Sequence, residues 1–167
     1  MFFDTHNHSQ FSFDGKGTTV EKSAVAAAEK GFGGICFTDH CDFYVPKMKE
    51  EFEPIVSEVF DVDAQQAEID RVNGLIAEGV YGKSVPRKFK VFKGIELGLG
   101  EKNHDQTREL LSGHKFDQII ASVHYLEDTD PYFGPYYNGK NWKEAYGRYL
   151  ETILREMRWL GDCLRIS

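Results

Sequence analysis

The sequence is poor in cysteine. Only three of its 167 residues are cysteines, Cys36, Cys41 and Cys163, and no two of them have the C-x-x-C spacing of a zinc ribbon or a redox motif. An odd, sparse set of cysteines predicts neither a disulfide framework nor a zinc ribbon. We therefore expect all three to be reduced thiols.

The chain also lacks long apolar runs, an excess of positive charge and the common nucleotide-binding motifs. No run approaches the about 20 residues that a membrane-spanning helix needs, and residues 1–5 do not have the basic and apolar segments of a secretory signal. The formal net charge of −7 argues against nucleic acid or an anionic membrane as a partner. Neither GxxxxGK[ST] nor a strand followed by GxGxxG is present. These absences predict a cytoplasmic protein with no nucleic-acid or membrane partner.

What the sequence does contain is an alternation of strand-like and helix-like patterns. Apolar runs of strand length occur at 1–5, 33–38, 89–96 and 116–122, and helical patterns occur at 18–30, 62–77, 106–111 and 142–160. Residues 42–61 are charged and aromatic without a clear period, residues 125–141 suggest a polar loop, and Cys163-Leu164 resembles the start of a fifth strand. The alternation predicts one α/β domain over 1–167, either a doubly wound sheet or part of a barrel, with parallel strands and right-handed crossovers.

The first candidate ligands are His6 and His8, where the first predicted strand ends. Residues two apart on a strand lie on the same face, so both imidazoles can approach one metal ion. The alternative is a pair of surface histidines. Asp14 follows before Gly15, in a segment that by itself is equally compatible with a simple turn.

The other predicted strands also end in ligand-type residues. His40 follows the second strand, and the preceding Asp39 could bind a metal, orient the imidazole or cap a turn. Adjacent Cys41 is expected to pack in the core, because neighbouring strand residues point to opposite faces. Glu96 ends the third strand and His124 the fourth; the alternatives are a salt bridge to a Lys or Arg for Glu96 and a hydrogen-bonded core histidine for His124.

Independent coincidences would seldom place His or Glu at the end of four successive strands. Together these residues predict a metal site at the carboxyl edge of the sheet, where α/β enzymes keep their chemistry. His104 and His114 lie outside this pattern and are expected at the surface. The Tyr and Trp residues between 132 and 149 could form a lid, although packing in the core or on a helix face is favoured.

The motifs resemble those of the PHP (polymerase and histidinol phosphatase) superfamily. The matching strings are Asp4-x-His6-x-His8, Ser12-x-Asp14-Gly15, Thr38-Asp39-His40, Gly94-x-Glu96 and Ser122-Val123-His124. Asp39-His40-Cys41 and the Ser-Val-His-Tyr string are most similar to the histidinol-phosphatase branch. The resemblance covers about residues 2–160, with the motifs in the family's order.

This resemblance implies a distorted (β/α)7 TIM-like barrel with up to three divalent ions (Zn, Fe or Mn) at the carboxyl ends of the strands, of which the chain would supply the first four βα units. It implies that His6 and His8 hold a first metal, that Glu96 bridges the first and second, that His124 binds the second, and that Asp14 and His40 bind the third. A metal-activated water held by His6, His8, Glu96 and His124 would then attack a phosphate monoester.

The chain departs from the family pattern in three places. A Gly-His-x-Asp string and a final Asp-x-His, which supply further ligands in the family, are not present, and Asp42 stands where the branch often has proline. Such barrels take about 250 residues. We therefore expect a PHP domain that is truncated before its fifth strand.

The resemblance implies hydrolysis of L-histidinol phosphate to L-histidinol and phosphate, a step of histidine biosynthesis, although this chain could be inactive by itself. Two alternatives stay open. One is a PHP phosphoesterase of other specificity, acting on phosphotyrosine or a small nucleotide. The other is a non-catalytic remnant that binds metal or a partner, or that self-associates through an unfinished sheet edge.

Overall fold

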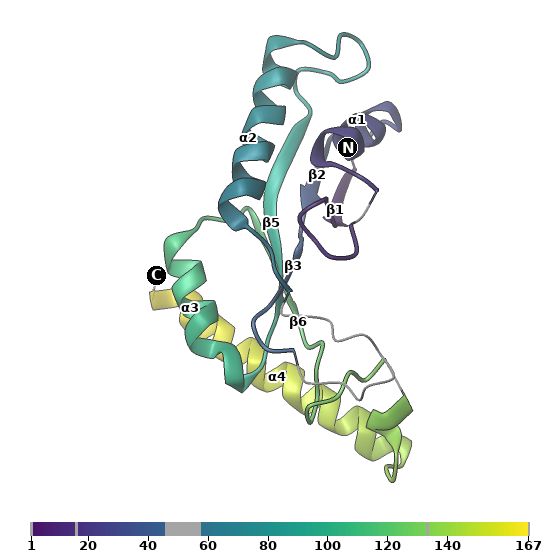
Figure 1. Ribbon diagram of the computed structural model, residues 1–167, viewed down its shortest axis with the longest axis vertical. Helices are drawn as coiled ribbons and strands as arrows, with labels where there is room; N and C mark the ends of the chain where they lie inside the picture. The colour runs from purple at the N-terminus through teal and green to yellow at the C-terminus, as the bar shows by residue number, and fades with distance from the viewer. Residues whose placement is uncertain (1, 16, 46–57, 133, 167) are drawn as a thin grey trace. The chain divides into compact units, whose positions relative to one another are not determined.

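The structure is a computed structural model that describes residues 2–15, 17–45, 58–132 and 134–166. Its elements are drawn in Figure 1. They are β1 (Phe3–Asn7), α1 (Val20–Glu29), β2 (Gly34–Phe37), β3 (His40–Asp42), β4 (Glu58–Val59), α2 (Val62–Glu78), β5 (Lys90–Gly98), the 3-10 helix η1 (Glu101–Asn103), α3 (His104–Gly113), β6 (Gln118–Ser122), the 3-10 helix η2 (Gly134–Tyr137) and α4 (Trp142–Ile166).

The chain divides into two compact units. The first comprises residues 1–41, 59–96 and 114–120, and the second comprises residues 42–58, 97–113 and 121–167. Each unit is described by itself below.

The strands form one sheet in the order β1-β2-β5-β3-β4, with β6 paired to β5. β1 runs parallel to β2, with Phe3 opposite Gly34, and β2 runs parallel to β5, with Ile35 opposite Val91. The four predicted strands are therefore present as β1, β2, β5 and β6. The prediction missed β3 and β4, because strands of three and two residues are too short to show a hydrophobic period.

The first unit is built around the apolar faces of α1 and α2. Helix α1 begins where the Thr19 hydroxyl accepts a hydrogen bond from the backbone N–H of Lys22. Helix α2 begins at Asp61, which caps it in the same way, and ends at Gly79, which has the left-handed conformation. Both helices bury residues against the parallel strands, in one cluster that includes Val20, Val72 and Val91 among others. This core fixes the strands whose ends carry the candidate site.

The second unit contains α3, η2 and α4. Its own small core joins Val123, Leu126, Tyr136 and Ala145. The prediction of a strand at Cys163-Leu164 is wrong, because α4 continues as a helix to Ile166. The reason is visible in the spacing: Glu156, Leu160 and Cys163 are all buried, and their separations of four and three residues belong to one helix face.

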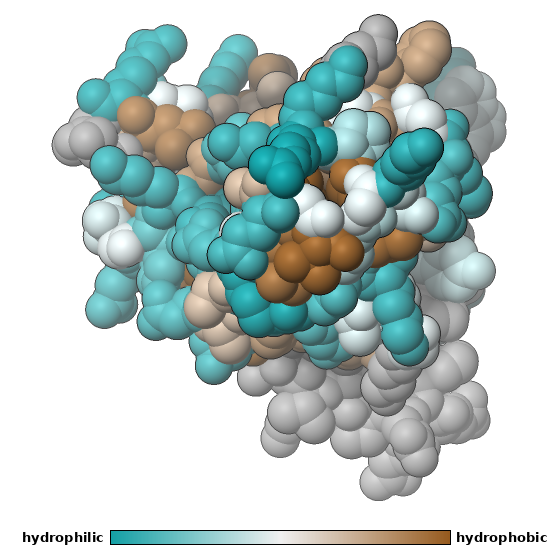
Figure 2. Space-filling view, turned by 90° about the horizontal axis from the view of Figure 1, so that it is seen from above, coloured by the Kyte–Doolittle hydropathy of each residue, from teal (hydrophilic) through white to brown (hydrophobic). Residues whose placement is uncertain are grey.

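The three cysteines are buried, and the face of the molecule shown in Figure 2 is largely hydrophilic. Cys36, Cys41 and Cys163 are all buried, and Cys41 has no exposed surface, which suits the packing role expected for it. In the face shown in Figure 2, hydrophilic residues surround a smaller hydrophobic area. Among the helices that the structure describes, none is long and apolar enough to cross a membrane.

Candidate metal centre

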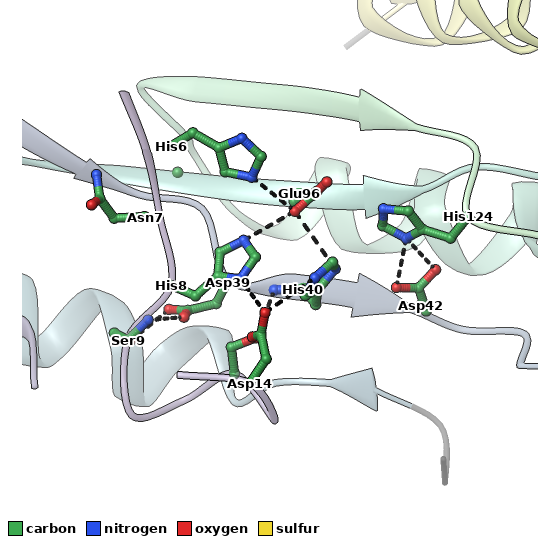
Figure 3. A network of polar contacts seen from close by, with 12 residues as sticks. His6, Asn7, His8, Ser9, Asp14, Asp39, His40, Asp42, Glu96 and His124 are labelled. Atoms are coloured by element: carbon green, nitrogen blue, oxygen red, sulfur yellow. Dashed lines mark hydrogen bonds and ion pairs between the residues drawn. The ribbon is translucent and has the colours of Figure 1, made fainter. Parts of the chain in front are cut away.

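The end of β1 directs two imidazoles at one carboxylate. The Nε2 atom of His6 lies 3.1 Å from Oε2 of Glu96, and Nε2 of His8 lies 3.0 Å from the same oxygen (Figure 3). The two histidines are two residues apart, so an extended backbone places both side chains on one side, as the sequence predicts. The parallel pairing of β1, β2 and β5 brings this strand end to Glu96, near the end of β5.

Glu96 is the most buried member of this cluster, with 7% of its side chain exposed. A carboxylate that is removed from water needs cationic or hydrogen-bonding partners. Glu96 has three imidazoles near Oε2, because Nδ1 of His40 lies 3.6 Å away. The backbone N–H of Glu96 donates to the carbonyl of Asp39, which fixes β5 beside the segment that carries His40.

Asp14 connects the same histidines from the other side. Its Oδ2 atom lies 2.8 Å from Nδ1 of His8 and 3.7 Å from Nε2 of His40. The hydroxyl of Ser12 donates to Oδ1 of Asp14 at 2.6 Å and so orients the carboxylate. The rings of His8 and His40 are 4.5 Å apart between centroids. The loop after β1 therefore brings a second carboxylate to the imidazole cluster.

These contacts change the pKa values of two groups. The contact with the Glu96 carboxylate raises the pKa of His8 to about 9; burial opposes this shift, and the Asp14 carboxylate adds to it. Burial alone would raise the pKa of the Asp14 carboxyl, but the hydrogen bonds with Ser12 and His8 outweigh burial and lower that pKa below its usual value. In the metal-free chain the pair is therefore ionic at neutral pH, with His8 protonated and Asp14 ionised.

The donor set fits a divalent cation. Two overlapping groups in the first unit each offer three ligand atoms that lie within 4.8 Å of one another: His6, His8 and Glu96, and His8, Asp14 and His40. Imidazole with carboxylate is ordinary ligation for zinc, iron and manganese. A cation bound by His8 would take the place of one proton of the imidazolium, since a metal ion binds only the neutral imidazole.

Asp39, next to His40, has a different surrounding. It has no exposed surface, and its carboxylate accepts hydrogen bonds from the backbone N–H and the hydroxyl of Ser9 and from Nε2 of Gln65. Of the three roles that the sequence left open for Asp39, none describes this one, which is to fix the loop after β1 against α2. The importance of Ser9 and Gln65 was missed, because neither residue carries a recognisable motif.

His124 belongs to the second unit, where it contacts Asp42. Its Nδ1 atom lies 3.0 Å from both carboxylate oxygens of Asp42, whose side chain is 3% exposed. Gly98 makes this possible, because a Cβ atom there would overlap the Asp42 carboxylate and come within 3.1 Å of the imidazole. Asp42 was missed as a site residue and was noted only for replacing a proline. A buried carboxylate that orients a ligand imidazole is common around metal sites.

The prediction that His104 is a surface residue is wrong. Nε2 of His104 lies 2.6 Å from Oε2 of Glu156, which is 1% exposed, and the imidazole ring stacks on Trp159 at 3.8 Å between centroids. Its position at the start of α3 suggested exposure, but α4 covers it. His114 is also only 24% exposed, and its Nε2 atom lies 3.3 Å from Oδ1 of Asp63. Neither residue belongs to the groups of candidate ligands described above.

A cleft of about 340 Å³ in the second unit is lined in part by His124, Lys102, Arg148 and Arg155. Its cations are neutralised by neighbouring carboxylates, since Lys102 contacts Asp128 and Arg155 contacts Glu101. Two adjacent residues of its rim, Glu127 and Asp128, have positive φ angles of 50° and 59°, which non-glycine residues seldom adopt. The Tyr and Trp residues between 132 and 149, for which packing was favoured over a lid, differ in burial. Tyr136 is buried in this lining, whereas Tyr132 and Trp142 are exposed.

The chain belongs to the PHP domain family, which matches residues 4–163. It is 33% identical over 158 residues to a probable histidinol-phosphatase of Clostridium acetobutylicum, covering 95% of this chain and 53% of that protein. It is 32% identical over 152 residues to a histidinol-phosphatase of Lactococcus lactis, covering 90% of this chain and 50% of the relative. The chain therefore spans about half the length of the curated relatives it matches.

Solved structures agree on the fold. The crystal structure of histidinol phosphate phosphatase from Lactococcus lactis, complexed with zinc, L-histidinol and phosphate, superposes with a TM-score of 0.72 at 29% identity, over 92% of this chain and 52% of that one. A putative histidinol phosphatase from Listeria monocytogenes gives a TM-score of 0.66 at 18% identity, over 90% of this chain and 59% of that one. The predicted α/β fold, part of a TIM-like barrel, is thereby confirmed, as is membership of the histidinol-phosphatase branch.

Proposed function

We propose that this chain carries metal-binding machinery of a phosphate monoester hydrolase, and that the substrate is L-histidinol phosphate, cleaved to L-histidinol and phosphate. One observation carries the proposal: three imidazole nitrogens, from His6, His8 and His40, lie within 3.0–3.6 Å of a single oxygen of the buried Glu96 carboxylate. The substrate is proposed from the relatives, whose names are histidinol-phosphatase, and from the zinc, L-histidinol and phosphate in the crystal structure of one of them.

In this proposal the residues hold metal in the arrangement expected from the family. His6, His8 and Glu96 would hold a first ion, Asp14 with His40 would hold another, and His124 would serve as a ligand of a further ion. When bound, such ions supply a nucleophilic water at neutral pH and neutralise charge on the phosphate. Zinc, iron and manganese all suit this donor set, and up to three ions are proposed.

The protein's own contribution is to position these donors. Ser12 orients the Asp14 carboxylate, Asp14 orients His8, and Asp42 orients His124. Asp39 fixes the loop that connects His8 to Asp14, through its hydrogen bonds to Ser9. Donors held in place before an ion arrives lose little conformational entropy on binding it, which favours tight binding.

Metal stoichiometry tests the first part of the proposal. The purified chain would be loaded with zinc, freed of excess metal, and measured by elemental mass spectrometry. We expect at least one tightly held ion for the native chain and a loss of bound metal in Glu96→Gln, with His114→Gln as the matched control that keeps it. Equal metal content in Glu96→Gln and the native chain would contradict the assignment of Glu96 as a ligand.

Hydrolysis tests the second part. Phosphate release from L-histidinol phosphate would be compared with release from phosphotyrosine and from small nucleotides, for this chain and for a relative of full length. Preference for L-histidinol phosphate supports the proposed substrate. Preference for another ester would assign the chain to a PHP phosphoesterase of other specificity, which is the alternative left open by the motifs.

A second candidate function is metal binding without hydrolysis. The observation that favours it is length, since about half of each curated relative has no counterpart in this chain. In that case metal would bind with the expected stoichiometry, but none of the three esters would be cleaved.

The single-domain organisation and cytoplasmic location stay predictions.

A further inference from the structure

Helix α4 has an exposed apolar stripe along one side. The helix has 25 residues, which corresponds to a length of about 37 Å, and it is the long helix at the C-terminal end of the chain in Figure 1. Its buried positions include Ala145, Glu156 and Cys163, which face the second unit. On the opposite side lie large hydrophobic residues that are 46–62% exposed: Tyr146, Leu150, Leu154, Met157 and Leu164. Scattered exposed hydrophobics are ordinary, but a continuous row of them is typical of an interaction surface.

The stripe has the spacing of a helix pair. Two sets of positions recur every seven residues, which is the repeat that keeps one seam of a helix facing a partner helix. One set is Leu150, Met157 and Leu164, and the other is Gly147, Leu154 and Gly161. In the second set Leu154 stands between Gly147 and Gly161, so this set has a large side chain only at its centre.

The charges beside the stripe follow the same repeat and change sign along the helix. They are Glu144, Glu151, Arg158 and Arg165, each seven residues from the next and all exposed. Within the described parts of the chain, Glu144, Glu151 and Arg158 have no side-chain ion pair, and Arg165 reaches only Asp162 at 4.0 Å.

Other charges of the same helix are paired. Arg148 contacts Glu127 at 3.3 Å, and Arg155 contacts Glu101 at 3.1 Å. These two arginines satisfy their charge within the protein. The row beside the apolar stripe therefore has a regular sevenfold spacing and, among the described residues, only the long Arg165–Asp162 contact as an ion pair.

We propose that the α4 stripe is the contact surface for a second copy of this chain, with the two α4 helices antiparallel around a two-fold axis at Leu154. In this arrangement Leu154 meets its own copy, and Gly147 lies opposite Gly161 of the partner, because these residues are equidistant from the axis. The same symmetry brings Glu151 beside the partner's Arg158, and Glu144 beside the partner's Arg165. A two-fold axis repeats each contact, so the interface has four ion pairs around one apolar seam.

The sign of the charges selects this partner and this orientation. A parallel pair of the same helices would place this row of charges on opposite sides of the seam in the two copies, so its charges would not meet. The antiparallel pair matches every charge of the row with an opposite one. A surface that is complementary to itself under a two-fold rotation is the property expected of an interface between identical chains.

The oligomeric state of the full 167-residue chain tests this proposal. Sedimentation velocity over the micromolar range is expected to show a concentration-dependent species of twice the mass of one chain. Leu154→Glu puts two like charges at the axis and is expected to weaken the dimer by roughly 30-fold or more. Val80→Glu is the matched control, because Val80 is 60% exposed and lies outside α4.

A charge exchange tests the orientation. Glu151→Arg and Arg158→Glu are each expected to weaken the dimer by roughly tenfold, and the double variant to restore it, because the exchanged charges again match across the axis. All of these residues are exposed, so circular dichroism is expected to show a native fold in every variant.

Three results would overturn the proposal. The first is a monomer at every concentration. The second is a dimer that Leu154→Glu leaves intact, which would point to another surface such as a sheet edge. The third is a double charge variant that is no better than either single one.

Discussion

Metal binding to the His8 cluster is expected to release a proton. In the metal-free chain the pKa of His8 is raised to about 9, mainly by the Glu96 carboxylate, so the imidazole is protonated at neutral pH. A metal ion binds only the neutral imidazole. Binding at neutral pH must therefore displace one proton, because the proton and the metal ion compete for the same ring nitrogen.

The size of this competition follows from the pKa. At pH 7 the imidazole lies about two pH units below its pKa, and removing the proton costs at most about 2.7 kcal/mol, or about a hundredfold in affinity. This figure is an upper limit, because His8 is only partly buried and solvent screens its contacts. The raised pKa also fixes the direction of the pH dependence. Protonated His8 stabilises the metal-free fold, and this contribution is fully present below the ordinary pKa of 6.5 and is lost as pH rises through about 9. Metal affinity changes in the opposite sense and increases with pH over that window.

Isothermal titration calorimetry measures this directly. The titration would be done at one pH between 7 and 8 in two buffers with different ionisation enthalpies, and the difference gives the number of protons released. We expect about one proton for the ion that binds His8, and an affinity that falls by up to about tenfold for each pH unit below 9. His114→Gln, which lies outside the cluster, is expected to behave like the native chain. A binding enthalpy that does not depend on the buffer, with an affinity that does not depend on pH, would refute the reasoning.

Three further predictions concern stability. Asp39→Ala leaves the buried donors of Ser9 and Gln65 without their acceptor. It is expected to lower the free energy of unfolding, measured in urea, by roughly 3 kcal/mol. Asp105→Ala is the control, because Asp105 is an exposed aspartate of α3. Gly98→Ala forces the buried Asp42 carboxylate to move, and a loss of about 2 kcal/mol is expected by the same measurement; an unchanged stability would contradict the close packing at this glycine. Chelation of metal from the loaded chain is expected to lower its melting temperature, since a ligand at about a hundred times its dissociation constant stabilises a fold by about 2.7 kcal/mol. A melting curve that the chelator leaves unchanged would mean that metal does not bind the folded chain preferentially.

Much of the site was predictable because it depends on local geometry and on parallel pairing. The spacing of His6 and His8 on a strand fixes their common side, and parallel strands bring the end of β5, with Glu96, to the same edge. The alternative for Glu96 was a salt bridge to a Lys or Arg, but the contacts described for its carboxylate are with imidazoles that lie about 90 residues away in the sequence. The start of α2 was also predictable, since Asp61 is an ordinary capping residue.

The parts that were missed depend on contacts between distant residues. His104 begins a helix in a charged segment, and only the later α4 covers it with Glu156 and Trp159. Cys163 follows Gly161-Asp162 and precedes an apolar residue, which locally suits a strand as well as a helix. The packing of α4 decides between them, and that information is spread over more than twenty residues.

The adjacent pair Asp39-His40 explains why the sequence left three roles open for the aspartate. Both residue types bind metals, and both follow the second predicted strand, so the local pattern treats them alike. An extended backbone separates them, because successive side chains point to opposite sides. Asp39 turns inward to the donors of Ser9 and Gln65, whereas His40 turns to Asp14 and Glu96. One residue therefore fixes the loop that carries the candidate ligands, and its neighbour joins them. Replacing Asp39 should then change stability and metal affinity together, because the donors around His8 are held in place by the loop that Asp39 fixes.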